Sequence, residues 1–143
     1  MFHRIVAWKI KRVWERIGGG DWRAATEGAA EDVHFHFVGD TPLALETRRR
    51  SEWEAWFARV FQTFPGIRFT LEECVVRGWP WRTRFVARVR IEASLQDGSR
   101  YQNTMTQWGL LRWGTLVDDV VLEDTVALAR ACAIQGQGAS SLV

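Results

Sequence analysis

The sequence predicts an α+β domain in which three N-terminal helices pack on one face of a curved antiparallel sheet. In the first half of the chain apolar residues recur mainly at helical spacing, whereas from Ile67 onward they alternate with polar residues as in strands. Helices followed by a strand meander are typical of α+β domains, because one face of the sheet must be covered. The length of 143 residues and the 47% hydrophobic content suit one domain over residues 1–143.

Local signals place the helices along the chain. The expected helices cover residues 5–17, 21–28 and 51–64. Glycines 18–20 end the first helix, and Asp21 is the expected N-cap of the short second helix. Ser51 and Glu54 have the spacing of a capping box, which marks the start of the third helix.

The strands follow from alternation and turn residues. The expected strands cover residues 33–38, 67–76, 83–95, 100–112 and 115–123, and residues 39–48 are expected to form a loop. Asp-Gly at 97–98 and Trp-Gly at 113–114 mark two hairpin turns. A short helix is expected over 125–133. Residues 134–143 show no apolar period, which leaves a core of about 5–133 and a flexible tail.

The register of the meander decides which side chains face inward. If Asp97 and Gly98 are the two central residues of their turn, Glu92 lies opposite Asn103. The same reasoning at 113–114 places Asn103 opposite Asp124. One face of the sheet then carries these three polar residues in a row, with Tyr101 beside them.

The apolar residues of the strands disagree about which face is the core. Phe85, Val89 and Ile91 favour the face opposite to Asn103, but that face also carries Asp119. Leu116 and its apolar neighbours favour the face with Asn103. One extra residue in a strand reverses the alternation, so a β-bulge would reconcile the two patterns. We favour the face with Asn103 as the inner one.

Composition and charge exclude several classes of protein. The 19 Lys and Arg are nearly balanced by 17 Asp and Glu spread along the sequence, so no nucleic-acid partner is expected. Cys74 and Cys132 have no metal-ligand spacing, so neither a metal site nor a disulfide is expected, and a reducing cytoplasm is the expected location. Charges interrupt the apolar residues of 1–17, so neither a signal peptide nor a membrane segment is expected.

Four short motifs carry a resemblance to a known family. They are Gly-Asp at 20–21, "FPGIRF" after the long helix, "DGSRYQN" at the first hairpin, and "WGTL" through "EDT" at the end of the meander. With the element order, they make residues 5–133 resemble the SnoaL-like branch of the nuclear transport factor 2-like superfamily. The resemblance implies a cone-shaped sheet with a mainly apolar pocket between sheet and helices. It also implies a homodimer and no cofactor.

Two enzyme groups of this superfamily suggest catalytic positions. "HFVG" is similar to the Asp-Pro-Val-Gly segment of ketosteroid isomerases and places His36 at their general-base position, where an imidazole with a pKa of about 6.5 could accept a proton. The tyrosine of those enzymes falls near Val13, and their oxyanion-hole aspartate falls near Thr106 or Gln107, so strong oxyanion donors are missing.

Limonene epoxide hydrolases provide the second comparison. Arg90 and Glu92 are similar to their Arg-x-Asp pair, but their second aspartate aligns with Val121. Epoxide opening needs one acid and one base around a positioned water, so half of that machinery is absent.

These observations together predict a protein that binds a hydrophobic small molecule. Acid–base chemistry would come from His36, assisted by Glu92 and Asp124. The expected ligand-binding residues are Tyr101, Asn103, Arg90, Gln107, Trp53 and Trp56. The reaction would be isomerisation, cyclisation or hydration of a polyketide-like or terpenoid-like substrate. The alternative is a non-catalytic binding or dimerisation module. In either case Trp79 and Trp81 are expected to shape the pocket mouth or a subunit contact.

Overall fold

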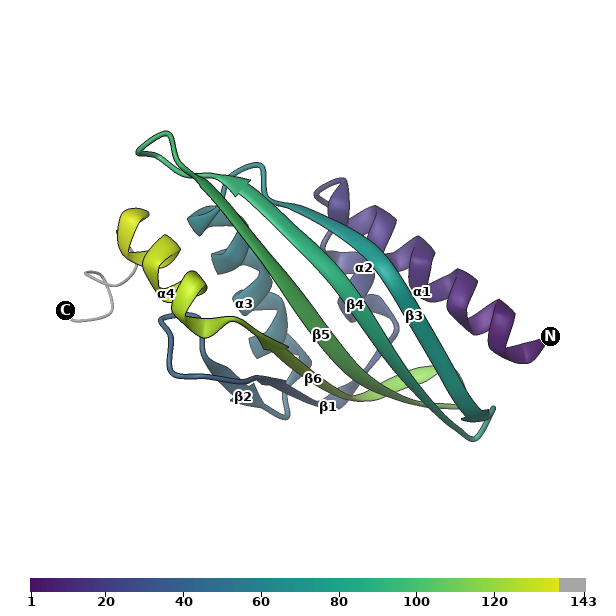
Figure 1. The fold of residues 1–143 in the computed structure, drawn as a ribbon. Coiled ribbons are helices and arrows are strands. Elements are labelled where there is room, and N and C mark those ends of the chain that lie inside the picture. The colour runs from purple at the N-terminus through teal and green to yellow at the C-terminus, as the bar shows by residue number, and fades with distance from the viewer. Residues whose placement is uncertain (137–143) are drawn as a thin grey trace.

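The computed structural model describes residues 1–136 and shows a curved six-stranded sheet with three helices on one face and a fourth helix at one end (Figure 1). The helices are α1 (Phe2–Gly18), α2 (Arg23–Glu27), α3 (Arg50–Thr63) and α4 (Thr125–Ile134). The strands are β1 (Ala29–Phe37), β2 (Leu45–Thr47), β3 (Arg68–Trp79), β4 (Arg82–Ser94), β5 (Arg100–Arg112) and β6 (Thr115–Glu123). The predicted α+β class and curved sheet are confirmed. Two helices precede the first strand and the third follows β2. Of the predicted tail, residues 137–143 lie outside the described residues.

The strand order differs from a simple meander in one place. The order is β2-β1-β6-β5-β4-β3, and β1 pairs in parallel with β6, whereas all other pairs are antiparallel. The expectation of a purely antiparallel sheet was therefore wrong for this pair. The segment expected to be a loop contains β2, which pairs with the end of β1 through Phe35 and Thr47. β1 thus lies inside the sheet, covered on both of its edges.

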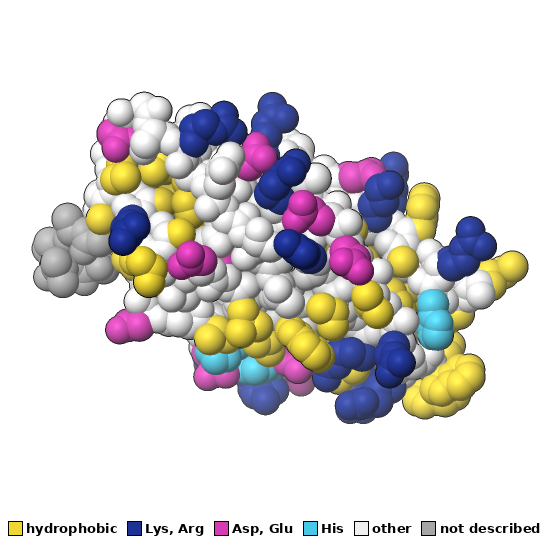
Figure 2. Space-filling view, in the orientation of Figure 1, with side chains coloured by type: hydrophobic (Ala, Val, Ile, Leu, Met, Phe, Trp, Pro, Cys, Tyr) yellow, Lys and Arg dark blue, Asp and Glu magenta, His cyan; other side chains and the backbone are white. Residues whose placement is uncertain are grey.

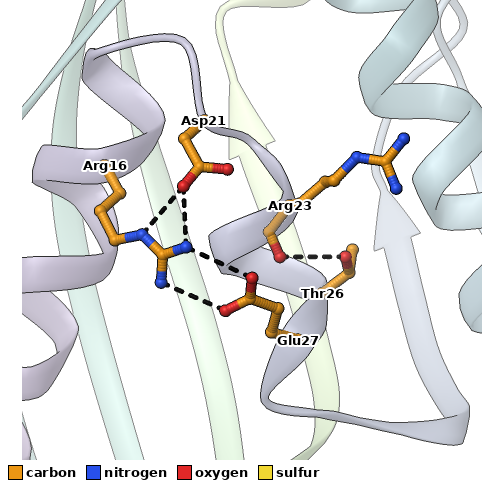
Figure 3. Close-up of polar contacts among 5 residues, drawn as sticks. All are labelled: Arg16, Asp21, Arg23, Thr26 and Glu27. Atoms are coloured by element: carbon orange, nitrogen blue, oxygen red, sulfur yellow. Dashed lines mark hydrogen bonds and ion pairs between the residues drawn. The ribbon is translucent and has the colours of Figure 1, made fainter.

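The starts of α2 and α3 do not use the predicted caps. Trp22 and Arg49 are the N-cap residues, and neither makes a side-chain capping bond. Asp21 instead accepts hydrogen bonds from Arg16, whose guanidinium also reaches Glu27 at the end of α2 (Figure 3). This exposed ion-pair network connects the last turn of α1 to both ends of α2. The capping predictions were wrong because Asp21 is engaged by Arg16, and because α3 begins at Arg50, which places Ser51 inside its first turn.

The register of the first hairpin follows from its turn. Leu95 N donates to Ser99 O at 2.8 Å and Gly98 has φ +86°, so the turn has three residues and not two. Ile91, and not Glu92, therefore pairs with Asn103. A shift of one residue exchanges the two faces of a strand. The shift moves Glu92 to the outer face, so it leaves the predicted row, whereas Asn103 still contacts the backbone of Asp124.

A β-bulge in β6 reconciles the remaining apolar pattern. Leu111 pairs with Leu116 whereas Leu110 pairs with Asp118, which leaves Val117 without a partner on β5. The bulge allows both Leu116 and Asp119 to point inward although they are three residues apart. The inner face carries every second residue from Phe85 to Ala93 of β4 and from Tyr101 to Gln107 of β5. Asp119 and Val121 of β6 lie on the same face.

Gly109 on β5 leaves room for an aromatic ring on the neighbouring strand. It pairs with Phe85, whose ring occupies the position that a side chain at 109 would need. Changing Gly109 to Ala is expected to lower the free energy of unfolding by about 1–3 kcal/mol, because the buried Phe85 ring must move. Urea denaturation checks this value. The control is Gly28→Ala, where no atom lies within 4 Å of the added carbon; an equal loss in both variants would contradict the steric explanation.

Candidate functional site

A cavity of about 460 Å³ lies between the inner face of the sheet and helices α1, α2 and α3. This volume is within the range of pockets that hold a small organic molecule. Most of the wall is apolar, and its aromatic part comprises Phe2, Trp14, Phe35, Trp53, Trp56, Phe57, Phe69 and Phe85. Phe35 stacks on Trp53 with ring centres 4.9 Å apart, so the rings that line the cavity also hold each other in place.

One polar chain crosses this apolar wall. Trp14 Nε1 donates to Gln107 Oε1 at 3.1 Å, and Gln107 Nε2 donates to Asp119 Oδ2 at 3.2 Å. The three side chains come from α1, β5 and β6, and all are buried cavity-lining residues. Because the indole can only donate, it fixes the orientation of the amide and thereby supplies a donor to the carboxyl group. Asp119 Oδ1 is buried and has no hydrogen-bond partner within residues 1–136.

The surroundings of Asp119 change its acidity. Burial raises the pKa of Asp119 from 3.8 to about 7, the hydrogen bond from Gln107 lowers it by a smaller amount, and the charge of Asp118 raises it. A carboxyl group with a pKa near 7 exchanges protons readily at neutral pH, so it can act as base or acid. The lining of this cavity therefore includes a titratable carboxyl group, one oxygen of which has no partner among the described residues.

Trp53 supplies a second polar atom without a partner. Its Nε1 is buried and forms no hydrogen bond with any described residue, and its ring lines the cavity. Trp56, the other predicted tryptophan of this helix, donates its Nε1 to Leu43 O at 2.7 Å. The residues that line the cavity thus include one with an unused donor, on α3, and one with an unused acceptor, on β6. Buried polar groups without partners are uncommon and are typical of places where a ligand binds.

A smaller pocket of about 30 Å³ adjoins the cavity through shared lining residues Trp56, Phe69 and Met105. Tyr101 lines it, and its hydroxyl group donates to Glu123 Oε1 at 3.3 Å and accepts from Asn103 Nδ2 at 2.7 Å. Burial raises the pKa of Glu123 to about 7. In contrast to Asp119 Oδ1, the polar groups of this pocket bind each other.

The structure brings only some of the predicted site residues together. Gln107, Trp53 and Trp56 line the cavity, Tyr101 lines the small pocket, and Asn103 is buried beside it. Asp124 caps α4 by accepting from Val126 N and Ala127 N. Arg90 and Glu92 form an ion pair at 3.0 Å on the outer face of the sheet. His36 also points to the outer face, because β1 buries Val33, Phe35 and Phe37 on its other side.

The two histidines of β1 belong to an ion-pair cluster on that outer face. His34 lies 2.8 Å from Glu46 and 2.6 Å from Asp118, and His36 lies 3.5 Å from Glu46. The hydrogen bonds to Glu46 and then Asp118 raise the pKa of His34. The cluster is a structural contact between β1, β2 and β6, away from the cavity.

A pH-dependent contribution to stability follows from this cluster. The raised pKa of His34 means that its stabilisation is complete below its ordinary pKa of 6.5 and is lost as the pH rises through the folded-state pKa. Changing His34 to Gln is therefore expected to destabilise the protein at pH 6 more than at pH 9. Thermal unfolding of both proteins across this range measures the difference; an equal effect at both pH values would contradict it.

Asp119, Trp14 and the Trp53 donor are the site features that the sequence interpretation missed. Asp119 was assigned to the face we did not favour, because the bulge at Val117 was not located. The available signal was the apolar set Phe85, Val89 and Ile91. These residues indicated that their face of the sheet is the inner one, and Asp119 had been assigned to that same face. Within residues 1–136, no three His, Cys, Asp or Glu side chains lie close enough to hold a metal ion, and no helix is long and apolar enough to cross a membrane.

Comparison with known families shows to which family the chain belongs. The profile of the SnoaL-like domain matches residues 10–119, about three quarters of the chain. The chain belongs to the SnoaL-like family. No curated protein sequence matches the chain significantly.

Solved structures resemble this SnoaL-like protein over most of its length. Bal32a, from a soil-derived mobile gene cassette, has a TM-score of 0.74 and 20% identity, over 87% of this chain and 93% of its own. IdmH from Streptomyces antibioticus, described as a candidate polyketide cyclase, has a TM-score of 0.70 and 19% identity, over 89% and 97%. TerC, crystallised with polyporic acid, has a TM-score of 0.73 and 18% identity, over 89% and 97%. At these identities the likeness shows a shared fold.

Proposed function

We propose that the protein binds a hydrophobic carbonyl compound in the main cavity and transfers protons within it through Asp119. The observation that carries this proposal is the buried Asp119 Oδ1, which has no partner among the described residues and lies in an otherwise apolar wall. Burial places the pKa of this group near neutrality, which suits a general base. His36, Glu92 and Asp124, the residues first expected to do this chemistry, lie outside the cavity lining.

The chemistry needs only the groups on the wall. Asp119 Oδ1 takes a proton from the carbon next to a ligand carbonyl, and the C–H electron pair forms an enolate. The enolate oxygen accepts a hydrogen bond from Trp53 Nε1, which has no other partner among the described residues. The enolate carbon then attacks a second carbonyl carbon of the same ligand, and Asp119 returns its proton to the new alkoxide. The sum is an intramolecular cyclisation with no net change of atoms.

The structural neighbours support the ligand class. IdmH is described as a candidate polyketide cyclase, and TerC was crystallised with polyporic acid. Polyketide-like chains carry several carbonyl groups on an apolar frame, which fits a cavity with few polar groups. Tyr101 and Asn103 lie beside the adjoining pocket and would receive the far end of a longer ligand.

Proton exchange in a simple ketone tests the proposal without knowledge of the natural substrate. The probe is 2-tetralone, a bicyclic ketone with acidic C–H bonds next to its carbonyl. In D₂O at pD 7 the protein is expected to catalyse deuterium uptake at these carbons, followed by proton NMR. Changing Asp119 to Asn is expected to lower the catalysed rate by at least about 100-fold, because the base is lost.

The neighbouring aspartate provides the control. Asp118 lies next to Asp119 but on the outer face, where it contacts His34. Asp118→Asn should keep the exchange rate of the unaltered protein. If Asp119→Asn exchanges as fast as the unaltered protein, Asp119 is not the base; if the unaltered protein does not exceed the buffer rate, the non-catalytic binding module is the better description.

We also propose that the outer face of the sheet forms a homodimer contact. Val120, Trp108, Val86 and Val75 are paired in sequence across β6, β5, β4 and β3, so they form one apolar row. Figure 2 shows hydrophobic side chains gathered across the lower part of this face. A row of exposed apolar side chains on a sheet face favours a contact surface. Light scattering should give twice the chain mass, and Trp108→Glu should reduce it to one chain mass; a monomeric unaltered protein would contradict the contact.

A further inference from the structure

The end of the molecule that carries the N-terminus has an unusual surface, which we call the aromatic tip. It consists of residues 1–12, the β3–β4 turn (77–84) and the β5–β6 turn (111–115). The backbone joins these segments: Trp113 N donates to Pro80 O at 2.8 Å, and His3 Nε2 lies 2.8 Å from Gly78 O. The two strand turns and the start of α1 therefore form one continuous surface (Figure 1).

Tryptophans dominate the aromatic tip and face the solvent. Trp8, Trp79, Trp81 and Trp113 each have between 54% and 74% of their surface exposed. The rings of Trp79 and Trp81 stack with centres 5.9 Å apart, and the ring of Trp81 lies 6.2 Å from that of Trp113. Exposed indoles are uncommon on a protein surface that meets only water, because each leaves a large apolar area in contact with solvent.

The backbone at Trp113 also indicates that this ring is held outward at a cost. Its φ is +52°, a conformation that Gly or Asn adopts easily and that costs other residues about 1–2 kcal/mol. Within residues 1–136 it is the one residue other than glycine with positive φ. The two-residue turn between β5 and β6 requires positive φ at both of its positions, and it holds the Trp113 ring outward.

Charge gathers on the same surface although it is evenly spread along the sequence. The three segments contain eight of the chain's 19 Lys and Arg and none of its 17 Asp and Glu. Of these eight, only Arg12 has an acidic partner within residues 1–136, namely Glu15 at 3.8 Å. On the visible side of this end, Figure 2 shows hydrophobic, basic and histidine side chains without acidic ones. The aromatic tip thus offers unpaired cations around exposed indoles.

Part of the aromatic tip lines the main cavity. Ile5, Lys9 and Gly114 belong to its segments, are exposed, and also line the cavity. If a partner surface binds the aromatic tip, a hydrophobic molecule could pass from that surface into the cavity with little exposure to water.

We propose that the aromatic tip docks on the surface of a membrane that contains anionic phospholipids. Indoles prefer the boundary between lipid headgroups and acyl chains, and clustered Lys and Arg are attracted to anionic headgroups. The exposed Arg4, Lys9 and Lys11 of α1 add to this attraction. A single-stranded nucleic acid fits less well, because Trp79 and Trp81 stack on each other and their facing surfaces are not open to bases. The docking is a surface contact without a spanning segment, and it does not depend on the chemistry at Asp119.

Vesicle binding tests the docking. The probes are vesicles of phosphatidylcholine alone, of equal parts phosphatidylcholine and phosphatidylserine, and of the mixture with brominated phosphatidylcholine. The protein is expected to cosediment with the anionic vesicles, less so with neutral ones, and less at high salt. Brominated lipid should quench part of its tryptophan fluorescence. The double change Arg82→Glu and Arg112→Glu is expected to lower the partition coefficient at least about 30-fold.

Matched variants at other places show whether the tip is responsible. Trp113→Ser should remove much of the quenching, whereas Trp22→Phe, beyond the other end of α1, should leave it unchanged. Arg130→Glu in α4, at the opposite end of the molecule, should bind vesicles like the unaltered protein (Figure 1). The proposal fails if anionic vesicles do not bind at low salt, or if Arg130→Glu weakens binding as much as the tip variants. It also fails if a single-stranded oligonucleotide binds the tip and vesicles do not. Loss of 2-tetralone exchange without loss of vesicle binding would count only against Asp119.

Discussion

Changing Asp119 to Asn is expected to stabilise the protein at pH 8 by about 2–4 kcal/mol, although it removes the proposed base. The pKa of Asp119 rises from 3.8 in its ordinary environment to about 7 in the fold. Between these values the folded protein keeps a proton that the unfolded chain has lost, so the free energy of unfolding falls as the pH rises. Above pH 7 the folded protein carries a buried carboxylate, and an amide at this position avoids that cost.

Urea denaturation of both proteins at pH 4, 6 and 8 measures this difference. The two free energies of unfolding should be similar at pH 4 and diverge as the pH rises. Glu123 and His34 also lower stability with rising pH, but they do so equally in both proteins. Asp32→Asn, at an exposed position of β1, is the control, since it leaves the buried carboxyl and the contacts of His34 in place. Parallel pH profiles for the unaltered protein and Asp119→Asn would show that Asp119 has an ordinary pKa.

Trp53 is expected to give the second large effect. Truncation to Ala should lower the free energy of unfolding by about 3–5 kcal/mol, because the ring is almost fully buried and stacks on Phe35. Trp53→Phe keeps an aromatic ring and removes a donor without a partner, so it should cost less than about 1.5 kcal/mol. The same variant should slow 2-tetralone exchange by about tenfold or more, because the enolate loses its donor.

Two measurements therefore separate the roles of this side chain. Denaturation reports the packing of the ring, and exchange kinetics report its N–H group. Trp22→Phe is the control, because Trp22 stacks on Phe57 but does not line the cavity. If Trp53→Phe exchanges as fast as the unaltered protein, the enolate has a different donor.

The element order and the family were predictable from sequence, whereas the faces of the strands were not. Apolar spacing and Gly-containing turns located β3 to β6 to within a few residues. The face of the sheet on which each side chain lies, however, depends on single residues. The turn at Gly98 has three residues, and Val117 forms a bulge. Each reverses every side chain beyond it. The two errors moved Glu92 and Arg90 from the outer face into the expected pocket and moved Asp119 out of it.

The site was predictable where large side chains determine it. Trp53 and Trp56 follow from the apolar stripe of α3. Gln107 lies on the same face of β5 as Asn103, which is the face predicted to be the inner one. The base was not predictable, because a carboxyl group among apolar residues has no local signal and because the His-Phe-His pattern of β1 drew attention to His36. The outward direction of His34 and His36 follows only once Val33 and Phe35 are known to face the core.

The parallel pairing of β1 with β6 has a consequence for the order in which the chain assembles. During synthesis β1 emerges about 85 residues before its partner β6. The edge of β1 that pairs with β6 therefore stays unpaired while the intervening helix and strands are synthesised. Until then the short β2 is the only strand beside β1, and it pairs with Phe35 to Phe37 alone. We therefore expect refolding to be slow and nascent chains that stop before residue 115 to aggregate, because an unpaired apolar strand is a template for other chains.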